Sequence, residues 1–206
     1  MPFSSIRAVA FDAFDTLIYT AEPQRPLDGL IRWLRQTKPA PRIDDACWLM
    51  SREFNLNALA ADLPSPVRHD LEQRLEREIA SITAFEDAQS TLMALKTRGY
   101  QLAICSNLIE PHAPAALRAL PIAWDAAVWS FEIAATKPSP AFYAAVADRL
   151  QLPPQQILFV GDHIVNDVTA PRKAGMQALY LRRGYASCVP GREISSLTDL
   201  PKLLAP

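Results

Sequence analysis

The chain has 206 residues, of which 50% are hydrophobic and 21% charged, a composition typical of a globular protein and too apolar for a disordered one. Its 21 Lys and Arg against 22 Asp and Glu give a formal net charge of −1, whereas nucleic-acid-binding proteins usually carry a basic excess. Charges or prolines interrupt every apolar run well before a membrane-spanning length. We therefore expect neither a nucleic-acid partner nor a membrane partner.

The cysteines and the N-terminus indicate a cellular location. Cys47, Cys105 and Cys188 are widely spaced and form no CxxC pair, so we expect reduced thiols. The first residues lead directly into an apolar run and lack the pattern of a signal peptide. These features predict a cytoplasmic protein, with Cys105 in its core because it lies inside an apolar segment.

Short apolar runs alternate with helical patterns along the chain. The runs that we predict to be buried strands are residues 7–11, 101–105, 126–129, 157–160 and 177–181. Strands that alternate with helices pair in parallel and carry helices on both faces of the sheet. The sequence therefore predicts an α/β fold with a doubly wound, Rossmann-like parallel sheet.

Three helices are predicted between these strands. One contains Leu92 and Leu95 and ends near Gly99, and the next has Phe142, Val146 and Leu150 at helical spacing. The third covers residues 167–174 and ends at Gly175.

Residues 18–83 interrupt the alternation, because only helical patterns stand out there. Two apolar stripes at helical spacing are Leu27, Leu30, Ile31 and Leu34, and Leu71, Leu75, Ile79 and Ile82. We expect an all-helical insertion over residues 18–83, with a small core of its own. Residues 1–17 and 84–206 would form the α/β core.

Two predicted strands end in residues that could act on a substrate. Asp12 follows the first strand directly, where a rigidly held carboxylate could be a covalent nucleophile or could simply cap a turn. Ser106 and Asn107 follow the second strand, where they could bind an oxyanion or close a turn. The carboxyl ends of parallel strands meet at one edge of the sheet, so we expect these residues to be neighbours.

Two further segments carry charged residues. Lys137 precedes a predicted helix and could supply a fixed positive charge for a phosphate or a carboxylate. Asp162 and Asp167 follow the strand at 157–160, with Gly161 permitting a close approach. They could bind a hard cation or cap the next helix.

Taken together and in this order, the motifs resemble the haloacid dehalogenase-like (HAD) hydrolase superfamily. Its pattern is DxDx(T/V), then Ser or Thr after a strand, then Lys, then an acidic motif such as GDxxxND. The resemblance implies that the insertion is a C1-type cap and that the protein is a hydrolase acting on a small molecule. It implies that Asp12 is the nucleophile and that Asp167 holds Lys137 or a metal-bound water. It further implies a Mg²⁺ site made by Asp12, Asp162 and the backbone carbonyl of Phe14, and a binding site for the transferred group made by Thr16, Ser106, Asn107 and Lys137.

Phe14 departs from the pattern of the family's phosphatases, which usually have a second Asp there as general acid and base. Phe cannot transfer a proton, and the absence of such a group typically costs about 10²–10⁴-fold in rate. Asp15 lies one position further, where many relatives have Gly, and its backbone direction differs. We do not expect Asp15 to replace the acid.

Three functions fit these residues. The first is a Mg²⁺-dependent phosphatase that forms an aspartyl-phosphate and acts on substrates with good leaving groups. The second is a metal-independent 2-haloacid dehalogenase, because a halide leaves without a proton and Tyr143 follows Lys137 at the spacing seen in those enzymes. The third is a nearly inactive relative that binds a ligand. We favour the phosphatase, because the carboxylates of Asp12 and Asp162 would repel each other unless a cation lay between them. Only the phosphatase of these three functions requires such a cation.

Overall fold

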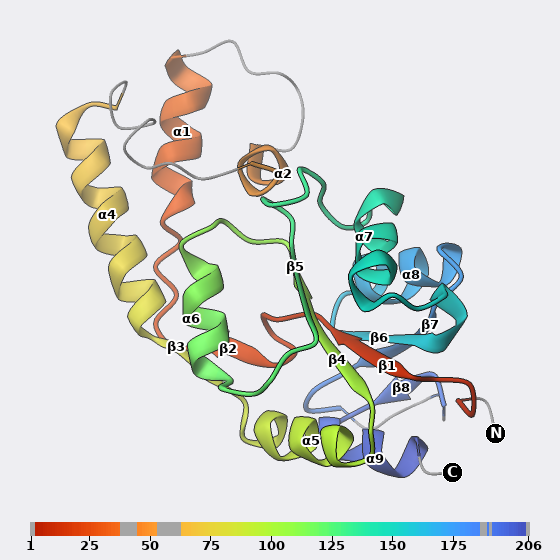
Figure 1. Cartoon of the computed structure of the whole chain (residues 1–206). Helices are drawn as coiled ribbons and strands as arrows, with labels where there is room; N and C mark the ends of the chain where they lie inside the picture. Colours follow the sequence, from red (N-terminus) through yellow and green to blue (C-terminus); the bar gives the residue numbers. More distant parts are fainter. Residues whose placement is uncertain (1–2, 38–44, 53–62, 186–188, 190, 205–206) are drawn as a thin grey trace.

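The computed structural model describes residues 3–37, 45–52, 63–185, 189 and 191–204 of the chain. Cys188 and parts of the expected insertion, residues 38–44 and 53–62, lie outside the described residues. The described elements alternate between strand and helix over most of the chain, and helices lie on both sides of a central sheet (Figure 1). The predicted α/β class is confirmed.

The central sheet has six strands in the order β5-β4-β1-β6-β7-β8, and all neighbours are parallel. The strands are β1 (Ala8–Phe11), β4 (Gln101–Ser106), β5 (Ala126–Trp129), β6 (Ile157–Gly161), β7 (Gln177–Leu181) and β8 (Glu193–Ile194). Five of them match the predicted runs to within a residue. The sequence analysis missed β8, because two residues are too few to show a pattern.

The two faces of the sheet carry different apolar clusters, because successive side chains of a strand point to opposite sides. Val9 and Phe11 face a cluster that includes residues of α5 (Glu86–Thr97), α6 (His112–Ala119) and α9 (Leu200–Leu203). Ala8 and Ala10 face a second cluster built with α7 (Pro140–Leu150) and α8 (Ala170–Lys173). Cys105 is fully buried in the second cluster, as predicted.

The predicted helix ends are confirmed in two places. Helix α5 stops before Gly99, whose φ of 84° is a left-handed conformation that glycine adopts without steric cost. The predicted helix at residues 167–174 begins earlier, as the π-helical turn η2 (Ile164–Thr169), and continues as α8, which ends at Lys173, two residues before Gly175. Two short 3₁₀ turns, η1 (Pro154–Gln156) and η3 (Leu197–Asp199), complete the connections.

Residues 18–83 contain helices, as expected, but their two ends are strands. The helices are α1 (Leu27–Thr37), α2 (Asp45–Met50) and α4 (Ser65–Ala80). Strands β2 (Ile18–Thr20) and β3 (Ile82–Ala84) pair antiparallel and connect this segment to the rest of the chain. The sequence analysis missed both strands and placed Ile82 in a helical stripe, because three residues are too few to show a strand periodicity.

The helices between β2 and β3 share a small apolar cluster. Leu30 and Leu71, one from each predicted stripe, are almost completely buried in it. Ile109, from the loop before α6, belongs to the same cluster, so these helices also pack against the α/β part. The division of the chain into a core and a cap stays a prediction.

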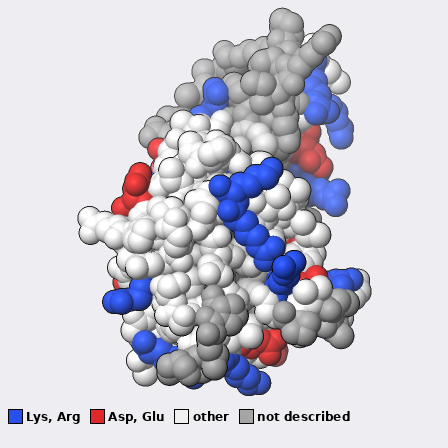
Figure 2. All heavy atoms as spheres, turned by 90° about the vertical axis from the view of Figure 1, so that its right-hand side faces the viewer, with Lys and Arg blue, Asp and Glu red and all other residues white. Residues whose placement is uncertain are grey.

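The helices on one side of the sheet carry basic side chains at the surface. Figure 2 shows a short line of Lys and Arg crossing a mostly uncharged face. Arg149, at the end of α7, forms an ion pair with Glu132, with 2.9 Å between Nη1 and Oε2.

Among the described residues, no helix has both the length and the apolar composition needed to cross a bilayer.

Asp87 in the first turn of α5 joins three segments of the core. Its carboxylate accepts two hydrogen bonds from Arg183, each 3.0 Å, and others from the Ser196 hydroxyl and the Leu197 N–H. Arg183 also donates to the carbonyl of Thr16 at 2.6 Å. Burial alone would raise the pKa of Asp87, but these donors outweigh burial and lower it.

Replacing Asp87 by Asn should lower the free energy of unfolding at pH 7 by about 2 kcal/mol, measured by urea denaturation. Because the folded pKa is depressed, this stability is present above the unfolded value of about 3.9 and is lost as pH falls through the folded pKa. The difference from wild type should therefore shrink below about pH 4. Glu86→Gln, an exposed neighbour in the same turn, is the control. If the difference in the free energy of unfolding between Asp87→Asn and wild type stayed the same at low pH, the ionised Asp87 carboxylate would not be the source of this stability.

Candidate active site

The register of the sheet places Asp12 at the carboxyl edge of its central strands. Phe11, the last residue of β1, lies opposite Ile104 of β4 on one side and Val160 of β6 on the other. The N–H of Asp12 continues the ladder by donating to the carbonyl of Val160 at 2.9 Å. The chain leaves β1 towards β4 and β5 and later crosses to β6 and β7, so this edge is a topological switch point, where ligands of such folds bind.

Lys137 lies between two of the carboxylates. Its Nζ donates to Asp12 Oδ1 at 2.7 Å and to Asp167 Oδ1 at 2.8 Å. The lysine side chain is only 3% exposed and Asp167 is fully buried. Burial alone would lower the pKa of Lys137, but the two carboxylates raise it, so the ammonium is charged. The predicted charge pairing of these three residues is present in the structure.

Asn107 fixes the backbone of Lys137. Its Nδ2 donates to the Lys137 carbonyl at 3.0 Å, and its Oδ1 accepts from the Lys137 N–H at 2.8 Å. The side-chain amide therefore connects the end of β4 to the segment that carries the lysine. The expected contact of Asn107 with a substrate stays a prediction.

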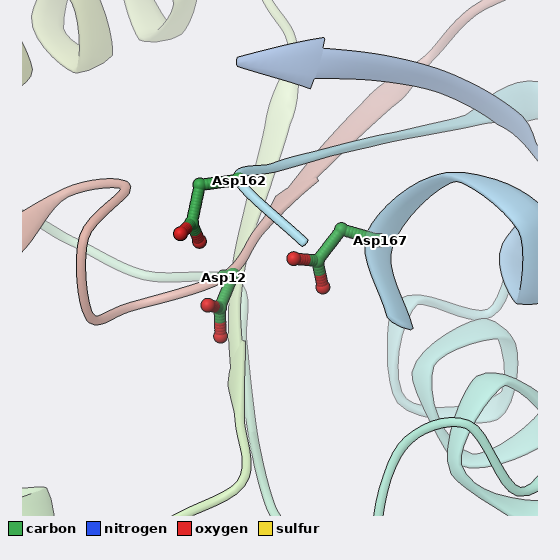
Figure 3. A group of neighbouring side chains, drawn as sticks. All are labelled: Asp12, Asp162 and Asp167. Carbon is green, nitrogen blue, oxygen red and sulfur yellow. The ribbon is translucent and has the colours of Figure 1, made fainter. Parts of the chain in front are cut away.

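Asp12, Asp162 and Asp167 form a group of three carboxylates. One oxygen from each lies within 4.8 Å of the others, and the three side chains converge from the end of β1, the end of β6 and the turn η2 (Figure 3). Asp162 accepts a hydrogen bond from Thr16 Oγ1 at 3.2 Å. Burial, followed by the negative charges of Asp12 and Asp167, raises the pKa of Asp162 to about 6. This all-oxygen set suits a hard divalent cation such as Mg²⁺, which would relieve that repulsion.

Gly161 and His163 determine where Asp167 lies. A Cβ at position 161 would stand 2.4 Å from Asp167 Cγ, so only glycine leaves room for this carboxylate. The N–H of His163 donates to Asp167 Oδ2 at 2.9 Å, while Lys137 holds the other oxygen. Burial raises the pKa of Asp167, and these donors oppose the shift. The close approach expected of Gly161 is confirmed.

The remaining predicted residues lie in the loops around this edge. Ser106 is the buried last residue of β4, and Thr16 is fully buried. Phe14 is half-buried, and its ring meets His112 edge-on with 5.8 Å between the centroids. Asp15 has a φ of 58°, a left-handed backbone conformation that favours glycine. The catalytic and binding roles of all these residues stay predictions.

Sequence reasoning missed two polar contacts near the site. The hydroxyl of Tyr143 donates to the carbonyl of Asn166 in the turn that carries Asp167. His112 Nε2 lies 3.0 Å from Glu78 Oε1, which joins α6 to α4. Neither contact has a local signal, because each depends on how distant helices pack.

Comparison with known proteins identifies the family. A family model described as haloacid dehalogenase-like hydrolase matches residues 6–175. The chain belongs to the haloacid dehalogenase-like hydrolase family. It is therefore a hydrolase of this family, as the sequence motifs predicted.

Members with two different activities are similar to the chain. It is 33% identical over 144 residues to (S)-2-haloacid dehalogenase 1 of Pseudomonas sp. (strain CBS-3), covering 66% of this chain but only 63% of that enzyme. It is 27% identical over 212 residues to a phosphoglycolate phosphatase of Shigella boydii serotype 4 (strain Sb227), covering 89% and 84% of the two chains. Phosphatases and dehalogenases thus both belong to its relatives.

Solved structures of both kinds share the fold. A HAD phosphatase from Thermococcus onnurineus superposes with a TM-score of 0.68 at 24% identity, over 97% of this chain and 98% of that one. The L-2-haloacid dehalogenase from Xanthobacter autotrophicus gives 0.64 at 21% identity, with the same coverage. At this identity the likeness establishes the fold alone.

Proposed function

We propose that the protein is a Mg²⁺-dependent phosphatase that works through an aspartyl-phosphate on Asp12. The carboxylate group of Asp12, Asp162 and Asp167 supports this proposal most directly, because three acids face one lysine. Lys137 hydrogen-bonds to Asp12 and Asp167, whereas Asp162 accepts a hydrogen bond from the hydroxyl of Thr16 and has a raised pKa. A divalent cation held by Asp12, Asp162 and the carbonyl of Phe14 would balance this charge. We place the enzyme in the cytoplasm, as the sequence predicts.

In the proposed reaction, an oxygen of Asp12 attacks the phosphorus of a phosphate ester. The new Asp12 O–P bond forms as the ester P–O bond breaks, and the leaving group takes its proton from water. Lys137 and Ser106 stabilise negative charge on the phosphoryl oxygens. Water then attacks the acyl phosphate, which releases inorganic phosphate and restores the Asp12 carboxylate. When bound, Mg²⁺ would supply a further positive charge at the phosphoryl oxygens.

Phe14 restricts the substrates of this reaction. No side-chain acid at position 14 protonates the leaving group, so esters of weakly acidic alcohols should react slowly. Aryl and acyl phosphates, whose leaving groups are stable as anions, should react best. The substrate class we propose is therefore a small phosphorylated metabolite with a good leaving group.

A second candidate is a metal-independent 2-haloacid dehalogenase. Phe14 favours it, since a halide needs no proton, and so does the similarity to the Pseudomonas dehalogenase. Against it, the Asp162 carboxylate adds a negative charge close to Asp12. The repulsion between the two carboxylates favours a bound cation, which a metal-independent enzyme would not have. A third candidate, a ligand-binding relative with almost no turnover, would retain the fold without this chemistry.

Hydrolysis of p-nitrophenyl phosphate tests the proposal, because its leaving group needs little protonation. We expect turnover with Mg²⁺ and its loss, by at least about 100-fold, when EDTA is added. Asp162→Asn should raise the Mg²⁺ concentration for half-maximal rate by about tenfold or more, while Asp148→Asn, an exposed residue of α7, should not.

The other candidates give different results in the same assay. Turnover that survives EDTA would contradict the metal-dependent mechanism. Release of chloride from 2-chloropropionate without metal would establish the dehalogenase instead. Failure with both substrates would leave the ligand-binding relative.

A further inference from the structure

A cavity of about 430 Å³ lies at the edge of the sheet opposite the candidate active site. Its lining includes Gln177 and Ala178, the first two residues of β7, and Gln155 in the turn η1 just before β6. Because neighbouring strands of this sheet are parallel, the starts of β6 and β7 lie at the end away from Asp12, which follows the last residue of β1. The cavity is large enough for a small organic molecule and takes no part in the proposed reaction.

Two arginines line this cavity, and both are attached to β7. Arg172, in the last turn of α8, donates from Nη2 to the carbonyl of Ala178 at 2.7 Å. The backbone carbonyl of Arg192, just before β8, accepts from the N–H of Tyr180 at 3.0 Å. Helix α8 lies at the right of Figure 1, on the side that Figure 2 presents, where Lys and Arg cross a mostly uncharged face. The cavity thus has two guanidinium groups at its wall.

Neither of these guanidinium groups has an acidic partner in the part of the chain that the structure describes. No described residue of the lining is Asp or Glu, whereas Arg149 and Arg183 elsewhere in the fold each form an ion pair. Burial, followed by the positive charge of Arg192, lowers the pKa of Arg172. Arginine nevertheless stays protonated in proteins, so the repulsion between the two groups persists. An anion bound between them would relieve it.

The rest of the lining defines the ligand further. Phe3, Met176 and Ala178 are buried apolar residues that line the cavity, and Gln155 and Gln177 add side-chain amides. A guanidinium group donates two parallel hydrogen bonds to the oxygens of a phosphate, and two such groups match the charge of a phosphate dianion. The apolar residues could at the same time contact a hydrocarbon group of the same ligand.

We propose that this cavity is a binding site for a small organic phosphate, whose phosphate group Arg172 and Arg192 hold while its apolar part packs on Phe3 and Met176. The site goes beyond the proposed function, because it lies at the other edge of the sheet and uses neither Asp12 nor a metal ion. A phosphonate has the same tetrahedral dianion, but its C–P bond is not a phosphate ester. Binding of a phosphonate can therefore be measured whether or not the protein is a phosphatase.

Nuclear magnetic resonance titration of the full chain tests both the place and the selectivity of binding. In metal-free, slightly alkaline buffer, the dianion phenylphosphonate should shift the backbone amide signals of residues 175–178 and 191–192. Benzenesulfonate has nearly the same shape but a single charge, so its Kd from these signals should be about tenfold or more higher. Methylphosphonate keeps the charge but lacks the ring, and its Kd should be about tenfold higher.

Variants connect the binding to the two arginines. Arg172→Gln and Arg192→Gln should each raise the Kd of phenylphosphonate about tenfold or more. The Arg192 side chain is exposed and forms no hydrogen bond or ion pair among the described residues, so its replacement should leave the fold intact. Lys173→Gln removes an exposed cation next to Arg172 that is outside the described lining, and it should change the Kd by less than about threefold.

The location of the shifts separates this inference from the phosphatase proposal. If phenylphosphonate binds at residues 175–178 and 191–192 while the protein hydrolyses no phosphate ester, the phosphatase proposal fails and the new site stands. Shifts confined to the residues around Asp12, or no shift at about 20 mM probe, would overturn the inference. Equal affinities for phenylphosphonate and benzenesulfonate would also overturn it, and so would an unchanged Kd in both arginine variants.

Discussion

Asp12→Asn should lower kcat for p-nitrophenyl phosphate by roughly 10⁴-fold or more, because an amide oxygen is a far poorer nucleophile than a carboxylate. The fold should survive, since the Asn side chain keeps an oxygen that can accept the hydrogen bond from Lys137 Nζ, 2.7 Å away in the wild type. Steady-state kinetics with saturating Mg²⁺ measure the effect. Thermal unfolding of both proteins shows whether the structure is intact.

Two further observations make this test specific to the nucleophile. Wild-type protein quenched in acid during turnover should carry a phosphoryl group on Asp12, detectable by mass spectrometry of its peptides, and the variant should not. Asp148→Asn, an exposed substitution on α7, should have the wild-type rate. If Asp12→Asn retained a tenth of the wild-type rate, another residue would be the nucleophile.

The strands that could be predicted from the sequence are the longer ones, with four to six residues each. β1, β4 and β6 are continuous apolar runs because both faces of the sheet are covered. β2, β3 and β8 have two or three residues each, and their pairing depends on the segments that they join. No periodicity can develop over so short a length.

The candidate site could be predicted where parallel strands bring motifs to one edge. The register that places Phe11 opposite Ile104 and Val160 follows from ordinary parallel pairing, so Asp12, Ser106 and Asp162 become neighbours. The hydrogen bonds of Asn107 to Lys137 and of His112 to Glu78 could not be predicted. They depend on loop geometry and on helix packing, which local patterns do not encode.

The charges at this edge also explain why its residues depend on one another. Lys137 neutralises Asp12 and Asp167 in a buried setting, and Gly161 leaves Asp167 close against the end of β6. Asp167 has no exposed surface, so it cannot turn towards water if the lysine is lost. The same ammonium that would stabilise a phosphoryl group therefore also stabilises the fold.

Lys137→Met should lower the free energy of unfolding by about 3–5 kcal/mol in metal-free buffer, because two carboxylates would be left buried without their cation. The double variant Lys137→Met/Asp167→Asn should recover a large part of this loss, since only one of the two charges remains. Urea denaturation of wild type, the two single variants and the double variant gives the coupling energy between the positions. Lys173→Met, an exposed lysine at the end of α8, should change stability by less than about 0.5 kcal/mol. Additive effects of the two substitutions would mean that Lys137 and Asp167 contribute to stability independently, and that the buried charge pair does not hold this edge together.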